Sequence, residues 1–364
     1  MRVCHVIDNM FRDRGGPVSV VAGLATAQRV AGDKPSVLAR IASRTGDRGE
    51  FPGLEIVEVP EGSGVAVARA LDVLRPEVLH LHCVWEPIQR HAARWATRRG
   101  VPWVLSTHGM LHEVPMRTGW AKKRAYLALL GGAVSGARRL LVTNEEEAHH
   151  ATHLSGVPAV VLPNGVDPAS FANPDPAAFR LAFPVVGDRP FLLFLGRIHS
   201  LKGLTGLVRS FAESRRLGVA ADLVLAGPPD GAEHDVRMAA ASAGVASAVH
   251  LVGPLYGSAC VDAMAACSLF VHRPLYEGFG MSVAEAMASG CPVVTTARCG
   301  IARFCPAGTL VVAQDSDEGF AEAIARTLLD PRECAAIGAR ARAWALGALS
   351  WEAVALQARA LYLP

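Results

Sequence analysis

The sequence lacks the paired cysteines that build disulfide frameworks. Its eight cysteines include no Cys-x-x-Cys spacing, and three of them, Cys4, Cys83 and Cys291, lie within or beside apolar runs typical of strands. Thiols in such positions behave as small buried apolar groups. Because disulfide-stapled domains are typical of oxidising compartments and show patterned cysteine spacings, we expect a protein of the reducing cytoplasm.

Long apolar runs and a strong net charge are also absent. No stretch of about 18 uninterrupted apolar residues occurs, so the sequence predicts no membrane-spanning helix. Met1 leads directly into an apolar strand pattern, without a signal peptide. The net charge of +3 is too small to indicate nucleic acid as a partner. Positive charges at 122–124 and 138–139 flank an apolar helix, where they are solvated or make a peripheral contact with the inner face of a membrane.

Two common nucleotide-binding motifs are missing from the first strand–loop–helix pattern. The loop at 12–17 is neither Gly-x-Gly-x-x-Gly nor a lysine-bearing phosphate loop, which argues against a dinucleotide-dependent oxidoreductase and a nucleoside triphosphatase. Its glycine pair, Gly15 and Gly16, precedes a predicted helix at 18–30. The free N–H groups of this pair suit a phosphate at the positive end of the helix, and a plain tight turn is the alternative.

The chain contains two successive alternations of short apolar runs with helical segments. Strand patterns occur at 3–8, 55–59, 78–82, 103–107 and 140–143, and then at 191–195, 222–227, 249–253, 268–272 and 292–295. This alternation predicts an α/β protein with two Rossmann-like, doubly wound domains. Prolines punctuate the region between the two alternations. We therefore place a first domain at 1–170, a linker at 171–190, a second domain at 191–345 and a C-terminal helix at 346–364.

The segment EGFGMSVAE is the most informative part of the chain. It places Glu277 at the carboxyl end of a predicted strand and Glu285 in the first turn of the next helix. Backbone N–H groups at Gly280, Met281 and Ser282 can bind an anion at the helix N-terminus. The two carboxylates can then bind hydroxyls on either side, which is the layout of a sugar–diphosphate–ribose. Alternatively, Ser282 and Glu285 form a capping box and Glu277 is a solvated loop acid.

Fixed positive charges and histidines follow other predicted strands. Arg197 ends a strand and Lys202 begins the following helix, which suits a diphosphate, with simple solvation as the alternative. His108 follows the strand at 103–107, where its ring can bind a sugar hydroxyl or a phosphate, or form an ordinary loop hydrogen bond. His80 and His82 alternate with apolar residues, so we expect them to pack or hydrogen-bond within the sheet.

Together these residues resemble the family 4 glycosyltransferases, which have the two-Rossmann-domain GT-B fold. The motifs span nearly the whole chain: Gly15-Gly16, Thr107-His108-Gly109, PNGVD at 163–167, Gly196-Arg197 with Lys202-Gly203, AGP at 226–228, and Glu-x7-Glu from Glu277 to Glu285. Each motif is weak alone, but their order and spacing are specific. STHGML at 106–111, followed by two lysines, also resembles a subgroup that builds bacterial surface polysaccharides. Two segments depart from the family pattern, RPLY at 273–276 and GDKP at 32–35.

The resemblance implies a retaining hexosyltransferase that uses a nucleotide-diphosphate sugar, with UDP favoured over GDP. The acceptor is expected to be a hydroxyl of a carbohydrate, a lipid-linked sugar or a similar compound, in polysaccharide or glycoconjugate biosynthesis. Transfer is expected between the two domains, with the terminal helix crossing back onto the first. Asp315 and Asp317 imitate the metal site of other glycosyltransferases, but their place at a helix start indicates a cap, so we expect no metal cofactor.

The same resemblance implies how the diphosphate is bound. Arg197 and Lys202 would neutralise its charge as it leaves, and the backbone N–H groups of Gly280 to Ser282 would add to the phosphate site. Gly15 and Gly16 would let the first loop approach the phosphates. Fixed positive charge of this kind stabilises a leaving diphosphate without reorganisation during the reaction.

The resemblance also assigns the hydroxyl-binding and catalytic groups. Glu285 would hold the ribose hydroxyls, and Glu277 would bind the donor sugar and stabilise the positive charge that develops at its anomeric carbon. His108 would contact the sugar from the first domain. A sugar-nucleotide 2-epimerase-like isomerase and a non-catalytic nucleotide-sugar-binding protein are the alternatives. The first needs a proton-abstracting carboxylate and histidine set that we do not find at matching positions, and the second would lose Glu277 or His108.

Overall fold

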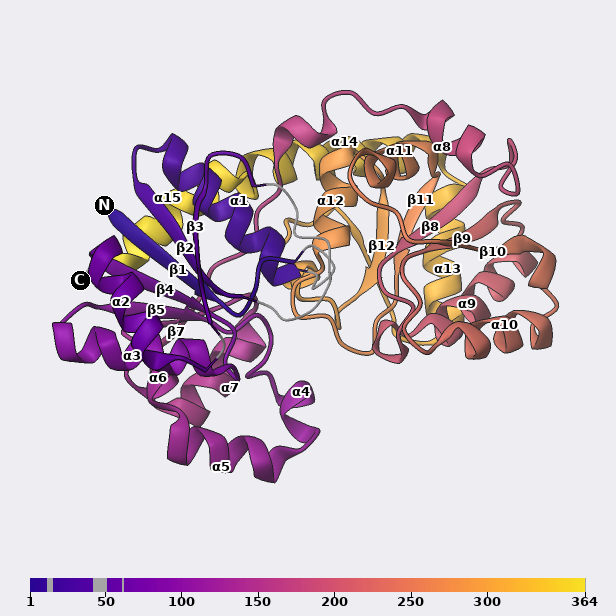
Figure 1. The fold of residues 1–364 in the computed structure, drawn as a ribbon. Helices are drawn as coiled ribbons and strands as arrows, with labels where there is room; N and C mark the ends of the chain where they lie inside the picture. Colours follow the sequence, from indigo (N-terminus) through magenta and orange to yellow (C-terminus); the bar gives the residue numbers. More distant parts are fainter. Residues whose placement is uncertain (12–15, 42–50, 61, 364) are drawn as a thin grey trace. The chain divides into compact units, whose positions relative to one another are not determined.

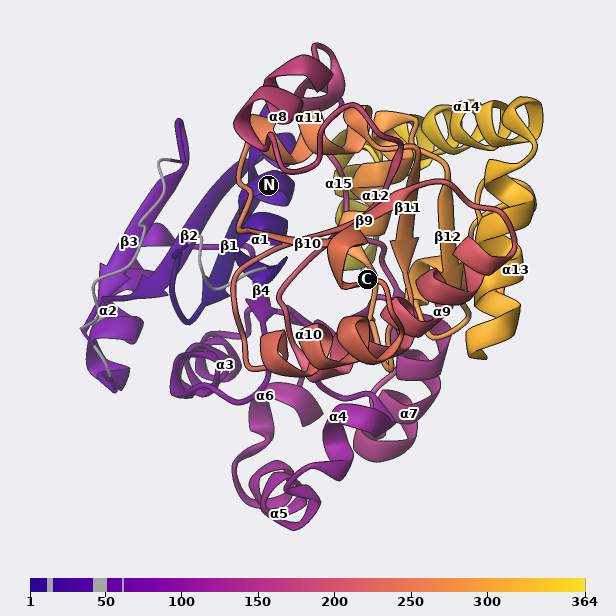
Figure 2. The same cartoon turned by 90° about the vertical axis from the view of Figure 1, so that its right-hand side faces the viewer.

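The computed structural model describes residues 1–11, 16–41, 51–60 and 62–363. The chain forms two compact units: the first comprises Met1–Gly165 together with Ser350–Pro364, and the second comprises Val166–Leu349. Each unit is a parallel sheet with helices packed against it (Figures 1 and 2). The predicted fold class, two Rossmann-like doubly wound α/β domains, is confirmed.

The first unit contains a seven-stranded sheet in the order β3-β2-β1-β4-β5-β6-β7. Its strands are β1 Arg2–Ile7, β2 Lys34–Arg40, β3 Glu55–Val59, β4 Val78–His82, β5 Trp103–Ser106, β6 Leu140–Val142 and β7 Ala159–Val161. Its described helices are α1 Gly16–Val30, α2 Gly64–Leu74, α3 Pro87–Arg99, α4 Glu113–Arg117, α5 Trp120–Leu130, α6 Gly132–Ser135, α7 Glu145–Ser155 and α15 Trp351–Tyr362. The strand order reverses between β1 and β4, and ligands of such sheets bind at that reversal.

The strand patterns seen in the sequence did not include β2 or the short edge strand β7. β2 begins with Lys34 and Pro35 and ends with Arg40, yet it pairs in parallel with β1 and places Val37 opposite His5. Five of its seven residues are buried. Proline is tolerated here because it lies at the start of the strand, where one missing donor costs little.

The terminal helix α15 is part of the core of the first unit. It runs beside α1 (Figure 1), and the apolar side chains that dock it are Trp351, Val354, Ala355, Ala358 and Tyr362. Glycines make room for the indole ring, since a Cβ at Gly23 would lie 2.2 Å from Trp351 Cε2 and one at Gly165 would lie 2.4 Å from Trp351 Cδ2. The last helix therefore completes a sheet unit whose strands come from the beginning of the chain.

The second unit contains a six-stranded sheet in the order β10-β9-β8-β11-β12-β13. Its strands are β8 Phe191–Leu195, β9 Asp222–Ala226, β10 Val249–Gly253, β11 Leu269–His272, β12 Val293–Thr296 and β13 Val311–Ala313. Its helices are η2 Pro168–Phe171, α8 Pro176–Ala182, η3 Ser200–Lys202, α9 Leu204–Arg216, α10 Glu233–Ser242, η4 Ala246–Ala248, α11 Ser258–Ala266, α12 Met281–Ser289, η5 Gly300–Arg303, α13 Asp317–Leu328 and α14 Pro331–Ala348. The strand order reverses between β8 and β11.

The segment predicted as a linker, 171–190, is built into the second unit. It contains α8, and the side chains of Phe179 and Val186 are buried in the apolar core of that unit. The boundary between the units follows Gly165. The prolines were misleading because proline is common both in linkers and at the starts of helices. Pro168 and Pro176 occupy the first positions of η2 and α8, where a missing N–H costs nothing. None of the helices in the described ranges is long and apolar enough to cross a membrane.

Candidate functional site

The candidate site of the second unit lies where its strand order reverses. β8 and β11 are neighbours there, and the loops that follow both strands leave the same edge of the sheet. These loops contact each other closely: the N–H of Leu275 donates to the carbonyl of Leu201 at 2.9 Å, and a Cβ at Gly203 would lie 2.2 Å from the Arg273 carbonyl oxygen. Gly203, with φ +65°, is therefore required at this contact.

Glu277 is the centre of a compact charged cluster at this edge. Lys202 Nζ donates to Glu277 Oε2 at 2.5 Å, and both side chains are only 20% exposed. His272 Nε2 lies 3.4 Å from the same oxygen, within ion-pair range but outside hydrogen-bond geometry. Burial alone would raise the pKa of Glu277, but the neighbouring His272 ring and the Lys202 charge outweigh it and lower the pKa to about 2. Glu277 is therefore an ionised carboxylate held in place, not a solvated loop acid.

The second carboxylate, Glu285, has a different environment. It is the fifth residue of α12, partly exposed, and burial raises its pKa to about 7. The helix begins at Met281, with Gly280 as its N-cap, so Ser282 lies inside the helix and caps nothing. The capping-box interpretation of Ser282 and Glu285 is therefore wrong. A carboxyl group in this state gains stability when donors such as hydroxyls reach it.

The N-terminus of α12 has no capping side chain. Gly280 has φ +101°, and a Cβ there would lie 2.6 Å from Cys299 Sγ, so only glycine fits. The helix has no side-chain cap, which leaves its first N–H groups, at Met281 and Ser282, free of a capping side chain. A helix end of this kind favours negative charge through both its N–H groups and its dipole.

The two cations predicted as one clamp have different partners. Arg197 Nη1 lies 2.6 Å from Asp230 Oδ2 in a pair whose arginine side chain is 62% exposed, whereas Lys202 contacts the partly buried Glu277. An exposed ion pair of this kind is worth roughly 0 to 1 kcal/mol, so Arg197 can exchange Asp230 for another anion at little cost.

The Asp-x-Asp pattern is engaged by arginines. Arg273 Nη1 and Arg209 Nε each lie 2.5 Å from a carboxylate oxygen of Asp317, and Asp315 pairs with Arg273 and Arg298. Between the two acids, Ser316 is the N-cap of α13 and accepts from the N–H of Gly319 at 2.9 Å. Sequence reasoning had noted Arg273 only as a departure from a family pattern. In the structure it joins the end of β11 to the start of α13.

In the first unit, His108 occupies a strained loop at the end of β5. Its φ is +52°, in the left-handed region that few residues other than glycine adopt. A buried carboxylate, Glu147, holds this loop: its oxygens accept from the Thr107 hydroxyl at 2.6 Å and from the N–H groups of Gly109 and Leu111 at 3.2 Å. Glu147 also lies in the first turn of α7, where its N–H donates to the side chain of the N-cap residue Asn144 at 2.9 Å.

The His108 ring is a neutral imidazole. Burial lowers its pKa to about 4, and its Nε2 lies 3.0 Å from His82 Nδ1. His80 and His82 are fully buried and hydrogen-bonded within the sheet, as the sequence indicated. Gly16 is the first residue of α1, with open space where a Cβ would lie, so packing does not require glycine there. Gly15 lies outside the described residues.

Comparison with known proteins matches each unit to a glycosyl transferase domain. The model described as "Glycosyl transferase 4-like domain" matches residues 15–165, and "Glycosyl transferases group 1" matches residues 178–344. A D-inositol 3-phosphate glycosyltransferase of Actinosynnema mirum is 30% identical over 84% of this chain and 78% of its own length. The protein of the same name from Geodermatophilus obscurus is 29% identical over 95% of this chain and 80% of its own length.

Solved structures agree on the fold. Sucrose-phosphate synthase from Thermosynechococcus elongatus covers 100% of the chain with a TM-score of 0.77 at 20% identity, and 98% of that structure is matched. HepE of Anabaena, solved in complex with UDP and glucose, covers 99% of both chains with a TM-score of 0.79 at 17% identity. At these sequence identities the structural likeness shows only the fold. Membership of the family is shown by the sequence matches. The chain belongs to the glycosyltransferases, and it is a sugar-transferring enzyme of the GT-B fold.

Proposed function

We propose that this enzyme transfers a hexosyl group from a nucleotide-diphosphate sugar to a hydroxyl acceptor with retention of configuration at the anomeric carbon. One observation carries the proposal: the ionised Glu277, fixed 2.5 Å from Lys202, stands at the strand reversal beside the open N-terminus of α12. Negative charge for a developing cation and positive charge for a departing diphosphate therefore occur side by side. Transfer from a sugar diphosphate needs both.

The residues divide the work as follows. The bond between the anomeric carbon and the diphosphate breaks, and the diphosphate leaves with the bonding electrons. Lys202, Arg197 and the N–H groups of Gly280, Met281 and Ser282 receive its charge. Glu277 stabilises the positive charge on the sugar, the acceptor oxygen bonds to the same face of the anomeric carbon, and the acceptor's proton passes to an oxygen of the departing diphosphate.

Glu285 is suited to the ribose hydroxyls. Its raised pKa, about 7, reflects burial without compensating donors, and two ribose hydroxyls would supply those donors. HepE of Anabaena was solved with UDP and glucose, which supports UDP over GDP as the nucleotide. Because three arginines engage Asp315 and Asp317, we propose that Lys202 and Arg197 neutralise the diphosphate without a metal ion.

The acceptor is proposed to be an anionic or lipid-linked hydroxyl compound of polysaccharide or glycoconjugate biosynthesis. The curated relatives are named for D-inositol 3-phosphate, which is an anionic polyol. On the first unit, α5 lies far from the sheet (Figure 1) and exposes Trp120 and Leu129 beside Lys122 and Arg124. Apolar and basic side chains together suit a peripheral contact with an anionic membrane surface.

The proposed function is tested by product analysis. The purified enzyme is incubated with UDP-glucose and a panel of acceptors that includes an inositol phosphate, and the anomeric configuration of the product is read by NMR. Retention with a glycosylated acceptor supports the proposal, and an inverted product contradicts it. Conversion of the sugar nucleotide without any acceptor would instead favour the epimerase-like function.

A further inference from the structure

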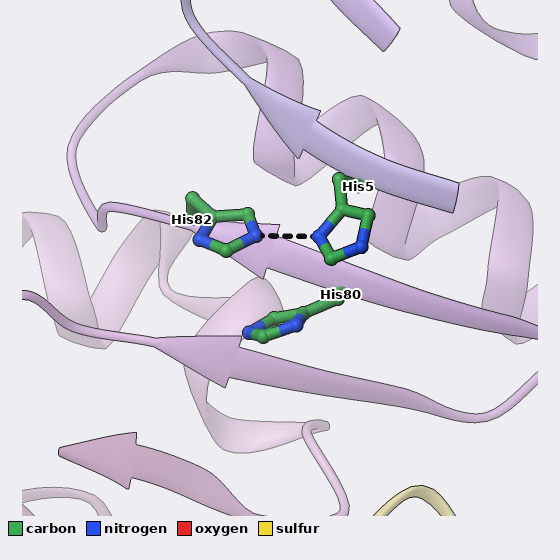
Figure 3. Close-up of side chains that lie close together, drawn as sticks. All are labelled: His5, His80 and His82. Atoms are coloured by element: carbon green, nitrogen blue, oxygen red, sulfur yellow. Dashed lines mark hydrogen bonds between the residues drawn. The ribbon is translucent and has the colours of Figure 1, made fainter. Parts of the chain in front are cut away.

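A chain of buried histidines runs behind His108 in the first unit. His5 of β1 and His80 of β4 are opposite each other in the strand register, and His82 lies two residues further along β4 on the same face (Figure 3). All three side chains are 0% exposed. Three imidazoles on the buried face of a sheet displace apolar packing, so they need a reason beyond the fold.

One branch of contacts joins His108 to α1. His108 Nε2 lies 3.0 Å from His82 Nδ1, and His82 Nε2 lies 3.0 Å from His5 Nδ1, the contact drawn in Figure 3. His5 Nε2 in turn lies 2.8 Å from Oε1 of the buried Gln28. The branch is continuous, since each inner ring uses one nitrogen toward each neighbour.

A second branch joins the same glutamine to the terminal helix. Gln28 Nε2 donates to the Tyr362 hydroxyl at 2.9 Å, and that hydroxyl lies 2.8 Å from His80 Nδ1. His80 Nε2 lies 2.7 Å from Ser106 Oγ. Gln28 is therefore held from both sides, with its amide oxygen toward the histidines and its amide nitrogen toward Tyr362.

The rings of this chain are neutral at pH 7, so each carries one N–H proton. Burial lowers the pKa of His5 to about 4 and moves the pKa of His80 and His82 well below the usual range. A neutral imidazole donates from one nitrogen and accepts at the other. Once the donor or acceptor role of one ring nitrogen is known, the roles of the nitrogens in the following rings are determined as well.

Gln28 fixes the donor and acceptor roles at the His5 end of the branch. An amide oxygen only accepts, so His5 carries its proton on Nε2 and accepts at Nδ1. His82 must then donate from Nε2 and accept at Nδ1, and His108 must donate from its own Nε2. His108 is left with an unprotonated Nδ1, which has no hydrogen-bond partner within the described part of the chain.

We propose that this relay, defined as Gln28, His5 and His82, fixes the tautomer of His108 so that its Nδ1 accepts a hydrogen bond from a sugar hydroxyl. The inference rests on the proposed function and on the family resemblance, which implies that His108 contacts the donor sugar. It also decides which group His108 contacts. The lone pair on His108 Nδ1 repels a phosphate oxygen and accepts from a hydroxyl, so His108 selects a hydroxyl. Gln28, His5 and His82 act through His108 and are positioning residues.

A metal site formed by His5, His80 and His82 is the competing interpretation, because one ligand nitrogen from each lies within 4.8 Å of the others. The hydrogen bonds argue against it. All six ring nitrogens already have partners, and the rings of His80 and His82 are stacked with centroids 4.1 Å apart. Lone pairs lie in the ring plane, so stacked rings direct them side by side and not at one point.

Two substitutions at the same position test the relay. Gln28→Glu keeps an acceptor toward His5, whereas Gln28→Leu removes it. Proton–nitrogen correlation NMR of isotope-labelled histidine is expected to show His108 protonated at Nε2 in the wild type and in Gln28→Glu, and a mixture of tautomers in Gln28→Leu. With UDP-glucose and the acceptor that the product analysis selects, kcat is expected to fall about tenfold in Gln28→Leu and to recover in Gln28→Glu, because Gln28→Leu misdirects one hydrogen bond to the sugar.

The outcomes separate the relay from the proposed function. A wild-type His108 protonated at Nδ1, or the same His108 tautomer in Gln28→Leu and the wild type, overturns the relay. If His108→Ala keeps wild-type kcat while the tautomers follow Gln28 as expected, the sugar contact fails and the relay direction stands. Stoichiometric zinc in the purified protein, lost in His82→Gln, would establish the metal site instead and overturn the relay.

Discussion

Replacing Glu277 with glutamine is the most direct test of the charged cluster. The change keeps the size and shape of the side chain but removes the negative charge that faces Lys202 Nζ at 2.5 Å and His272 Nε2 at 3.4 Å. If the carboxylate acts on charge that develops only in the transition state, kcat should fall and the donor KM should change little. The expected loss is roughly 100-fold or more, the effect of removing one preorganised electrostatic contact.

The same substitution has a calculable effect on stability. The pKa of Glu277 falls from the ordinary 4.5 to about 2 in the folded protein. Because the pKa is depressed on folding, the ionised group stabilises the native state above about pH 4.5, and this contribution is lost as the pH falls toward about 2. The shift corresponds to on the order of 3 kcal/mol at pH 7, or roughly 6 to 12 °C in the melting temperature of a unit of this size.

Both effects are measured on the same samples. Steady-state kinetics with saturating donor and acceptor are recorded well below the melting temperature of the variant, and thermal melts are recorded at pH 7 and at pH 3. Glu333→Gln is the matched control, because Glu333 is exposed and pairs with Arg340 at the surface. It should leave kcat and the melting temperature near the wild-type values. A Glu277→Gln enzyme with near wild-type kcat would refute the catalytic role.

Three further predictions follow from the same structure. Glu285→Gln should raise the donor KM more than it lowers kcat, and unchanged donor affinity would contradict the ribose contact. The same substitution should raise the melting temperature above pH 7. The reason is that a carboxyl group with a pKa raised to about 7 loses native-state stability as the pH rises through that value. EDTA should leave activity intact, since Asp315 and Asp317 are engaged by arginines, and loss of activity restored by magnesium or manganese would count against this. Neutralising the charges at 122–124 and 138–139 should reduce sedimentation with anionic liposomes at low salt, and unchanged sedimentation would argue against the membrane contact.

Local patterns were enough to predict the fold class and to propose the site residues. A buried parallel strand is a short apolar run, and glycine, proline or a capping residue marks the start of a helix. The alternation of strands and helices can therefore be recognised in the sequence. Glu277 could be placed at the end of a strand because the apolar run stops at His272. Predictions failed at β2, at the 171–190 segment and at the start of α12, where proline or a serine–glutamate spacing is compatible with more than one local structure.

The partners of these residues were decided only by the tertiary structure. Lys202 contacts Glu277 because β8 and β11, far apart in the sequence, are neighbours in the sheet. Glu147 of α7 reaches Thr107, 40 positions earlier in the chain, because β5 and β6 are neighbours. The relay to His108 depends on the register of β1 against β4 and on the docking of α15, which brings Tyr362 to Gln28 across 334 positions of the chain. The sequence determines which side-chain groups are present. A hydrogen bond or a shifted pKa depends on two groups that lie close together, and only the packing of segments far apart in the sequence decides which groups these are.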